Sequence, residues 1–286
     1  MLTVFTPAYN RANELPRLYD SLKNQTCTDF EWVVVDDGSQ DHTEQLMKEY
    51  LDENILNIQY FRQENGGKMR AHNRGAQMAQ GELFVCIDAD DWLTPDAVET
   101  IISKKDHIVS QNLGGMMFLN YDGESKNIIG SMFPFKEAVY SYYEVYNKLG
   151  VTGDKTLVYL TDIVKEFPFP EIENEKFVPE ALVYNRISEV YKLLCINVAI
   201  KRVEYLPDGI SNNYFNICRK NPKGQTLYYK ELYMKIPSLY NAAAYDMYCI
   251  YSKMKICEAI KEHPSKFVAL IMYIPAYIKY LLKERK

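Results

Sequence analysis

The fold is decided by the stretch EWVVVDDGSQD, residues 31–41. Its three consecutive valines, Val33 to Val35, are typical of a strand buried on both faces of a parallel sheet. Acidic residues and a glycine follow directly, and they mark the end of that strand. Asp41 then favours an N-cap for a helix, with Glu44 three residues on, at the spacing of a capping box.

The alternation of strand and helix extends outward from this stretch through the first hundred residues. The sequence predicts a helix opened by Asp41, further helices over 13–23 and 68–79, and strands over 2–6, 31–35, 55–61 and 83–87. This order is typical of an α/β fold with a doubly wound, mostly parallel sheet and right-handed crossovers. Ligands of such sheets bind at the carboxyl ends of the strands, so we expect the site there.

Beyond residue 114 the pattern is less regular. Segments 116–121 and 125–132 are predicted as mixed or antiparallel strands, 181–190 as a helix and 195–205 as a strand, and the chain from about residue 225 as helical. Residues 267–282 are mostly apolar but too few for a membrane span, which needs roughly 20. Two interpretations stay open: a helix packed on the body, or an interfacial membrane helix with basic anchors over 283–286.

Composition excludes several classes of function. The chain of 286 residues has a net charge of −5, whereas proteins that bind duplex nucleic acid need a basic face, so we expect no nucleic-acid partner. None of the six cysteines forms a CxxC pair, which disfavours a zinc site. With no signal peptide in the sequence, we expect reduced thiols and a cytoplasmic location.

The strongest chemical signal is the sequence IDADDW, residues 87–92. Three carboxylates in four residues follow a buried strand, and hard oxygen ligands at this density suit Mg²⁺ or Mn²⁺, which in turn bind diphosphate oxygens. Helix capping by Asp91 or Thr94 is the alternative. Capping accounts for one acid but not for Asp88 and Asp90 together, so the sequence favours a metal site.

Three further clusters follow predicted strands. Asp36 and Asp37 can accept hydrogen bonds from a base or a ribose, although they also suit a plain strand-to-helix turn. Tyr9 can stack on a nucleobase. The glycines before Lys68 could hold phosphates, although the Walker spacing is absent and a flexible loop is the alternative.

Together these motifs resemble family 2 glycosyltransferases with the GT-A fold. The resemblance is carried by Thr3–Arg11, Glu31–Thr43, Asn65–Gly75 and Gly81–Pro95. It implies a nucleotide-sugar donor, usually UDP-linked, a divalent metal (Mn²⁺ or Mg²⁺) and inversion at the anomeric carbon. By position, Asp90 would bind the metal and Asp88 the ribose or the metal, while Tyr9 and Asp37 would contact the nucleobase. The donor site that the resemblance implies is completed by Pro7, Asn10, Asp36, Lys68, Arg74, Ala89 and Arg186.

The segment from Glu175 to Ile187 resembles the stretch around the family's catalytic base. We assign that base to Glu180, with Arg186 six residues on. Glu180 follows Pro179 at a helix start, so it could instead only complement the helix dipole. Glu175 and Glu173 are the fallback candidates, because the family often carries Glu-Asp where this chain has Pro179-Glu180.

The resemblance also implies an organisation and a setting. We expect a glycosyltransferase domain over 1–215, with a nucleotide-sugar half (1–105) and an acceptor half (106–215), and a helical extension over 216–286. The enzyme would transfer a hexosyl or N-acetylhexosaminyl group in bacterial surface polysaccharide or lipid-linked oligosaccharide synthesis. Its carbohydrate acceptor and a peripheral contact through 267–286 would place it at the inner face of the membrane. The alternative is a catalytically inactive nucleotide-sugar or polysaccharide-binding module.

Overall fold

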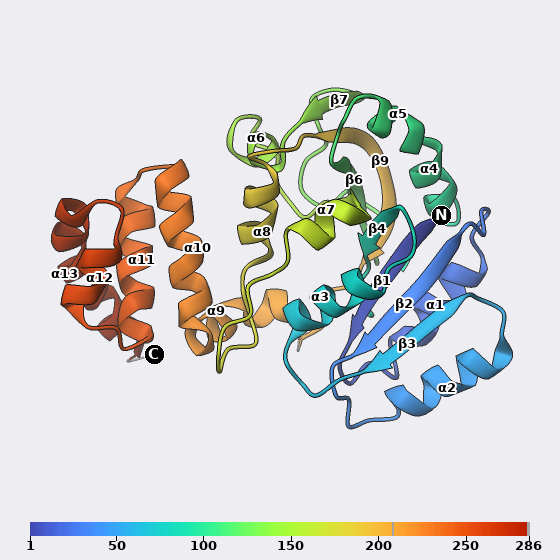
Figure 1. The fold of residues 1–286 in the computed structure, drawn as a ribbon, viewed down its shortest axis with the longest axis horizontal. Helices are drawn as coiled ribbons and strands as arrows, with labels where there is room; N and C mark the ends of the chain where they lie inside the picture. Colours follow the sequence, from blue (N-terminus) through green and yellow to red (C-terminus); the bar gives the residue numbers. More distant parts are fainter. Residues whose placement is uncertain (208, 285–286) are drawn as a thin grey trace. The chain divides into compact units, whose positions relative to one another are not determined.

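The computed structural model describes residues 1–207 and 209–284, and they form two compact units (Figure 1). The first, here called the sheet unit, is built from Met1–Phe169 and Tyr184–Pro207. The second, the helical unit, is built from Pro170–Val183 and Asp208–Lys286. Residues 170–183, which sequence analysis placed in the acceptor half, thus group with the C-terminal helices.

A single nine-stranded sheet organises the sheet unit, in the order β3-β2-β1-β4-β8-β6-β9-β5, with β7 paired to β9. β1 to β4 are mutually parallel, β8 is antiparallel to β4 and β6, and β6 is parallel to β9. The strands are β1 (Leu2–Ala8), β2 (Phe30–Asp36), β3 (Ile58–Arg62), β4 (Leu83–Cys86), β5 (Trp92–Leu93), β6 (Gly115–Asp122), β7 (Glu137–Tyr140), β8 (Thr156–Leu160) and β9 (Leu193–Val203).

Helices cover both faces of this sheet. On one face Val4 of β1 belongs to a buried cluster with Leu18 of α1, and on the other Phe5 packs against His72 of α3, with 5.5 Å between ring centroids. The helices of the sheet unit are α1 (Leu15–Lys23), α2 (Thr43–Glu53), α3 (Lys68–Met78), α4 (Ala97–Ser103), α5 (Lys105–Ser110), α6 (Tyr142–Asn147) and α7 (Thr161–Glu166); α8 (Glu180–Ile187) begins in the helical unit and ends in the sheet unit.

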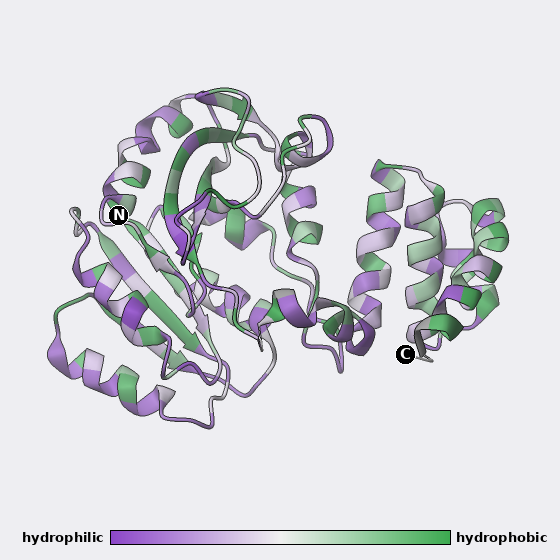
Figure 2. Cartoon of the chain, turned by 180° about the vertical axis from the view of Figure 1, so that it is seen from behind, coloured by the Kyte–Doolittle hydropathy of each residue, from purple (hydrophilic) through white to green (hydrophobic). Residues whose placement is uncertain are grey.

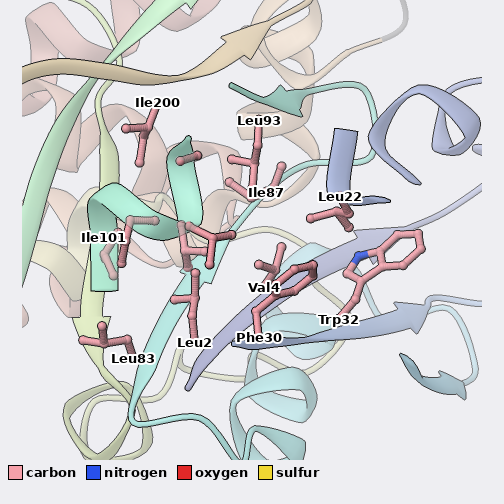
Figure 3. Close-up of a cluster of buried hydrophobic side chains, with 14 of the residues drawn as sticks. Leu2, Val4, Leu22, Phe30, Trp32, Leu83, Ile87, Leu93, Ile101 and Ile200 are labelled. Carbon is pink, nitrogen blue, oxygen red and sulfur yellow. The ribbon is translucent and has the colours of Figure 1, made fainter. Parts of the chain in front are cut away.

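The main hydrophobic core lies between β1, β2, β4 and the helices on one face (Figure 3). Alternate residues of β1, Leu2 and Val4, point into it, as period-two strands require. Trp32 of β2 is fully buried there, and its indole N–H donates to the Thr6 hydroxyl at 3.0 Å, so the ring is buried without losing its hydrogen bond.

The predicted α/β fold with a mostly parallel sheet is confirmed, but one predicted strand is wrong. Residues 125–132 form a turn and an irregular segment that meets β6 at a bridge from Tyr121 to Ile128. The Asp122 carboxylate accepts a hydrogen bond from the Ser125 N–H at 2.7 Å, and Lys126 has a left-handed φ of 60°. This local turn competes with strand geometry.

The helical unit contains α9 (Ile210–Lys220), α10 (Pro222–Lys235), α11 (Leu239–Tyr251), α12 (Ile256–Glu262) and α13 (Lys266–Glu284). Its own small core is formed by Tyr245, Cys249 and Ala259, with Tyr273 packed against them. Among the described residues, no helix has the length and apolar character needed to cross a membrane. Residues 285–286, the end of the predicted membrane-contact segment 267–286, lie outside the described residues.

Candidate active site

Four loops meet at the carboxyl edge of β1 to β4. The parallel register pairs Ala8 with Asp36 and Asp36 with Arg62, so the ends of the first three strands are level. Phe5 is paired with Cys86, which brings the acidic loop after β4 to the same edge. All the sequence clusters that follow these strands are therefore gathered at one place.

Asp36 shapes the first of these loops from inside. It is fully buried, and its carboxylate accepts hydrogen bonds from the Ser39 N–H at 2.7 Å and the Tyr60 hydroxyl at 2.8 Å. Gly38 follows with φ +80°, and a Cβ there would lie 3.0 Å from the backbone nitrogen of Asn65. Only glycine allows both this turn and the close approach of the next loop.

Asp37 joins that loop to the start of α3. Its two carboxylate oxygens accept hydrogen bonds from the Gln63 side chain (2.8 Å) and from the N–H groups of Gly66 (2.8 Å) and Gly67 (2.6 Å). Asp37 thus holds the 63–67 loop in place. The sequence assignment of Asp37 to a nucleobase contact stays a prediction, now alongside this structural role.

The loop after β1 is pinned by Asn10 and leaves Tyr9 exposed. Asn10 has a left-handed φ of 53°, its N–H donates to the Ser39 hydroxyl at 2.9 Å, and its side-chain oxygen accepts from the Gln40 N–H at 2.7 Å. Tyr9 beside it is 44% exposed, and its stacking on a nucleobase stays a prediction. Pro7, also assigned to the donor site, lies inside β1 opposite Val35.

Asp41 also belongs to this network and does not cap α2. The N-cap position is His42, while Asp41 accepts hydrogen bonds from the N–H groups of Thr43 at 3.0 Å and Ala12 at 3.1 Å. The expected N-cap at Asp41 is therefore wrong, and the His42 side chain forms no cap hydrogen bond to α2. The carboxylate closes a local turn and ties it to the loop after β1.

In the acidic loop, Asp88 is paired with Lys68. The Lys68 Nζ lies 2.8 Å from one carboxylate oxygen and 2.9 Å from the other. Burial alone would raise the pKa of Asp88, but the ammonium groups of Lys68 and Lys201 outweigh it and lower that pKa below its ordinary value. Asp88 is therefore ionised at neutral pH.

Asp90 has a different environment. In the part of the chain that the structure describes, its carboxylate forms no ion pair, while Ala89 beside it is buried. Burial, and then the neighbouring carboxylates of Asp88 and Asp91, raise the pKa of Asp90 to about 6. A carboxylate destabilised by like charges is one that a cation would stabilise.

Asp91 forms the structural ion pair of the loop. It is 3% exposed, and its carboxylate lies 2.6 Å from the Nζ of Lys201 on β9. Burial disfavours the charged ammonium, but Asp91 and Asp88 more than offset this and raise the pKa of Lys201. The pair anchors the acidic loop to β9.

Sequence reasoning missed a second anchor, formed by Arg17 of α1. Its guanidinium donates to the Asp90 carbonyl at 2.6 Å, forms an ion pair with Glu204, and lies 3.8 Å from the centroid of the Trp92 ring. Glu204 and Arg17 are 187 positions apart, so no local pattern could have revealed them. For the first anchor the sequence offers one signal, which is that Lys201 stands among apolar residues of a predicted strand.

Three other predicted site residues lie on the helices α3 and α8. Arg74 lies on α3 with its guanidinium 4.9 Å from the Phe61 ring centroid. Glu180 is the first residue of α8, in the segment assigned to the helical unit, and Arg186 lies in the last turn of that helix, in the sheet unit. The fallback base Glu175 accepts hydrogen bonds from the N–H groups of Lys223 (2.7 Å) and Gly224 (2.8 Å), which makes it a cap for α10.

The sequence profile described as Glycosyl transferase family 2 matches residues 3–156, which contain all four loops at this edge. The chain belongs to glycosyltransferase family 2. The match also covers more than half of the sequence.

Two curated relatives show how much of the chain is shared. Glycosyltransferase GlyA of Streptococcus pneumoniae is 35% identical over 169 residues, which are 58% of this chain and 23% of GlyA. The poly(ribitol-phosphate) beta-N-acetylglucosaminyltransferase TarS of Staphylococcus aureus is 27% identical over 196 residues, 65% of this chain and 33% of TarS. The matched segments therefore cover a third or less of either relative.

Solved structures confirm the GT-A type fold. The crystal structure of S. aureus TarS 1-349 in complex with UDP-GlcNAc has a TM-score of 0.62 at 18% identity, covering 99% of this chain and 92% of that one. The mannosyltransferase PcManGT from Pyrobaculum calidifontis, in complex with GDP-Man and Mn²⁺, has a TM-score of 0.56 at 16% identity, covering 97% and 79%. At these identities the likeness shows the fold alone.

The acidic loop of this family 2 chain fits a divalent cation to which the protein supplies only one or two ligands. Within residues 1–207 and 209–284, no group of three or more His, Cys, Asp or Glu side chains could enclose a metal ion. Mg²⁺ in phosphate-transfer sites is held by one or two carboxylates, with water and substrate phosphates completing the shell. Asp90, destabilised by its acidic neighbours, and Asp88 supply such a set.

Proposed function

We propose that this chain is an inverting, metal-dependent glycosyltransferase that moves a hexosyl or N-acetylhexosaminyl group from a UDP-sugar to an acceptor hydroxyl. The observation that carries the proposal is the edge at which the exposed Tyr9, the Lys68 ammonium and the acids Asp88 and Asp90 are gathered on one parallel sheet. An aromatic face, a cation and a pair of hard oxygen ligands match a base, a diphosphate and a metal.

The residues have separate tasks in this proposal. Tyr9 stacks on the nucleobase, while Asp37 contacts the base edge and keeps the 63–67 loop in place. Lys68 carries a positive charge beside Asp88, which would meet the phosphates of the donor. Asp88 and Asp90 would hold Mn²⁺ or Mg²⁺, which supplies neutralisation of the charge that develops on the departing diphosphate.

Glu180 is the proposed general base. Its carboxylate takes the proton of the acceptor hydroxyl as the oxygen attacks the anomeric carbon. Attack comes from the face opposite the leaving diphosphate, so the configuration inverts. The name of TarS, a beta-N-acetylglucosaminyltransferase, supports this outcome, because inversion of an α-linked donor gives a β-linked product.

The donor and acceptor classes rest on the relatives. TarS binds UDP-GlcNAc and PcManGT binds GDP-Man with Mn²⁺, and the 27% sequence identity to TarS favours UDP. The name of TarS gives poly(ribitol-phosphate), a polymer, as what it acts on. We therefore propose a surface polysaccharide or lipid-linked carbohydrate as the acceptor, and the inner face of the membrane, with peripheral contact through 267–286, as the place of action.

A ligand panel tests the proposal. The protein is heated with UDP, GDP, CDP or dTDP, each with and without Mn²⁺, and hydrolysis of the corresponding nucleotide-sugars is followed without acceptor. Saturation at about 100 times the dissociation constant stabilises the folded state by about 2.7 kcal/mol. We expect a metal-dependent shift with UDP and slow hydrolysis of a UDP-sugar. A shift with another nucleotide changes the donor, and UDP binding without any turnover favours the inactive binding module.

A further inference from the structure

The outer face of α13 is a continuous apolar surface. Residues at spacings of three, four and seven along the helix are all at least 41% exposed, and Phe267 and Ile274 reach 73% and 68%. This surface, here called the α13 face, consists of Phe267, Leu270, Ile271, Ile274, Tyr277, Ile278, Leu281 and Leu282. Hydrophobic colouring recurs along this helix in Figure 2.

The opposite side of α13 is packed, so the orientation of the helix is fixed. Ala269 and Ala276 are fully buried, and Tyr273 packs against the core of Tyr245 and Cys249. The α13 face is therefore not a core surface left open by fraying. Monomeric soluble proteins seldom leave so many large apolar side chains together in water, because burying each one fully contributes about 1.5–3 kcal/mol.

The C-terminal segment that carries this face has an excess of positive charge. Residues 208–286 contain thirteen Lys and Arg against six Asp and Glu, a net charge of +7 in a chain whose total is −5. Lys266 and Lys279 of α13 are exposed, and the Lys279 ammonium lies 5.7 Å from the ring centroid of Tyr240, itself 66% exposed. An apolar helix face, bordered by lysines and tyrosines, thus lies on a strongly basic segment.

From these observations we propose that α13 docks in the plane of an anionic lipid surface. The apolar side chains enter the acyl boundary, the lysines meet anionic headgroups, and Tyr240 and Tyr277 lie at the interface, where their rings are apolar and their hydroxyls wet. A second copy of the chain fits less well, because two segments of +7 would repel each other. This deepens the proposed function, on which the choice of a membrane acceptor rests, by naming the surface that brings the site to it.

A vesicle co-sedimentation assay tests the docking. The full chain is mixed with phosphatidylcholine vesicles, with or without about 30% phosphatidylglycerol, at low salt and at roughly 0.5 M NaCl. We expect binding to the anionic vesicles that weakens at high salt. A double variant, Leu270→Glu/Ile274→Glu, should bind at least about tenfold more weakly, since each large apolar side chain accounts for a factor of about ten or more.

The matched control is Ile55→Glu, which places the same charge at a 58% exposed isoleucine of the sheet unit. It should bind vesicles as the unaltered chain does. Circular dichroism of all variants shows whether each one is folded, and the UDP shift, measured without vesicles, reports separately on the proposed function. The proposal is overturned if the unaltered chain ignores anionic vesicles. It is also overturned if the chain is a dimer that the double variant converts to a monomer, because the second copy then covers the face.

Discussion

The sheet unit and the helical unit differ in how their buried acidic side chains are partnered. At the sheet edge every buried acid has a partner. Asp36 and Asp37 accept hydrogen bonds, and Asp91 forms an ion pair with Lys201. In the helical unit, Asp246 of α11 is equally buried, yet neither of its carboxylate oxygens has a partner among the described residues. Buried polar groups are normally satisfied, so the contrast is informative.

The two units also differ in how many of their large apolar side chains are buried. The core of the sheet unit encloses its large residues, whereas the helical unit leaves the α13 face in water. The sheet unit presents the edge at which we propose that a nucleotide-sugar binds. The helical unit presents the apolar α13 face, which we propose meets a lipid surface.

The largest expected effect concerns Glu180, which lies in the segment Pro170–Val183 of the helical unit. Replacing Glu180 by Gln keeps the size of the side chain and removes the base, so kcat should fall by about 10²–10⁴-fold. Binding of UDP with Mn²⁺, measured by calorimetry, should change by less than about twofold, because a base that acts on the acceptor does not hold the donor.

Glu173→Gln is the matched control in the same segment, since Glu173 is exposed and was a fallback candidate for the base. It should keep full turnover. A Glu180→Gln enzyme as fast as the unaltered one would place the base elsewhere, and a slow Glu173→Gln enzyme would place it there.

The paired edge predicts a large loss of stability when one partner is removed. Lys201→Met leaves Asp91 buried without its cation, which should lower the free energy of unfolding by about 3–5 kcal/mol. Adding Asp91→Asn should recover most of that loss, because the uncompensated charge is gone. Urea unfolding of the three variants checks this, and equal losses in the single and double variants would contradict it.

Removing the charge of the unpaired Asp246 should raise the free energy of unfolding, by less than the loss expected for Lys201→Met. Burial raises the pKa of Asp246 from its ordinary 3.8 to about 7. Folding therefore favours the protonated form, and the carboxylate begins to cost stability as the pH rises above about 4, with the full cost above about 7. Three pKa units correspond to a cost of about 4 kcal/mol for burying the ionised carboxylate. The amide of an Asp246→Asn variant would also be buried without a partner, so part of that cost would remain.

Asp246→Asn should accordingly raise the stability of the helical unit by about 1–3 kcal/mol at pH 8, and by almost nothing at pH 4. Differential scanning calorimetry at the two pH values measures the change. A variant less stable at pH 8 would show that the carboxylate has a favourable partner, and the contrast between the units would then disappear.

The sequence predicted those parts of the fold and site that depend on neighbouring residues. β1 to β4, α3 and the acidic loop are each specified by short contiguous patterns, so their positions followed from periodicity and motif. The strand predicted over 125–132 failed, because the side chain of Asp122 forms a local turn there. Strands β5, β7 and β8 were not predicted.

The supports of the site could not be predicted for a different reason. Asp91 and Lys201 are 110 positions apart, and Arg17 and Glu204 are 187 apart. Such pairs exist only after the sheet has brought β9 beside the acidic loop. Motifs name the groups that face a ligand, and the tertiary fold decides what holds them.

The central claim is that Asp90 makes nucleotide binding depend on a divalent cation. Calorimetric titration of UDP, with and without Mn²⁺, into the unaltered chain and Asp90→Asn tests it directly, with Asp52→Asn on the exposed face of α2 as the matched control. The account predicts that Mn²⁺ tightens UDP binding in the unaltered and control chains but not in Asp90→Asn. The turnover of Asp90→Asn should also be about 100-fold lower than that of the unaltered chain. An Asp90→Asn protein that keeps the full Mn²⁺ effect would contradict it.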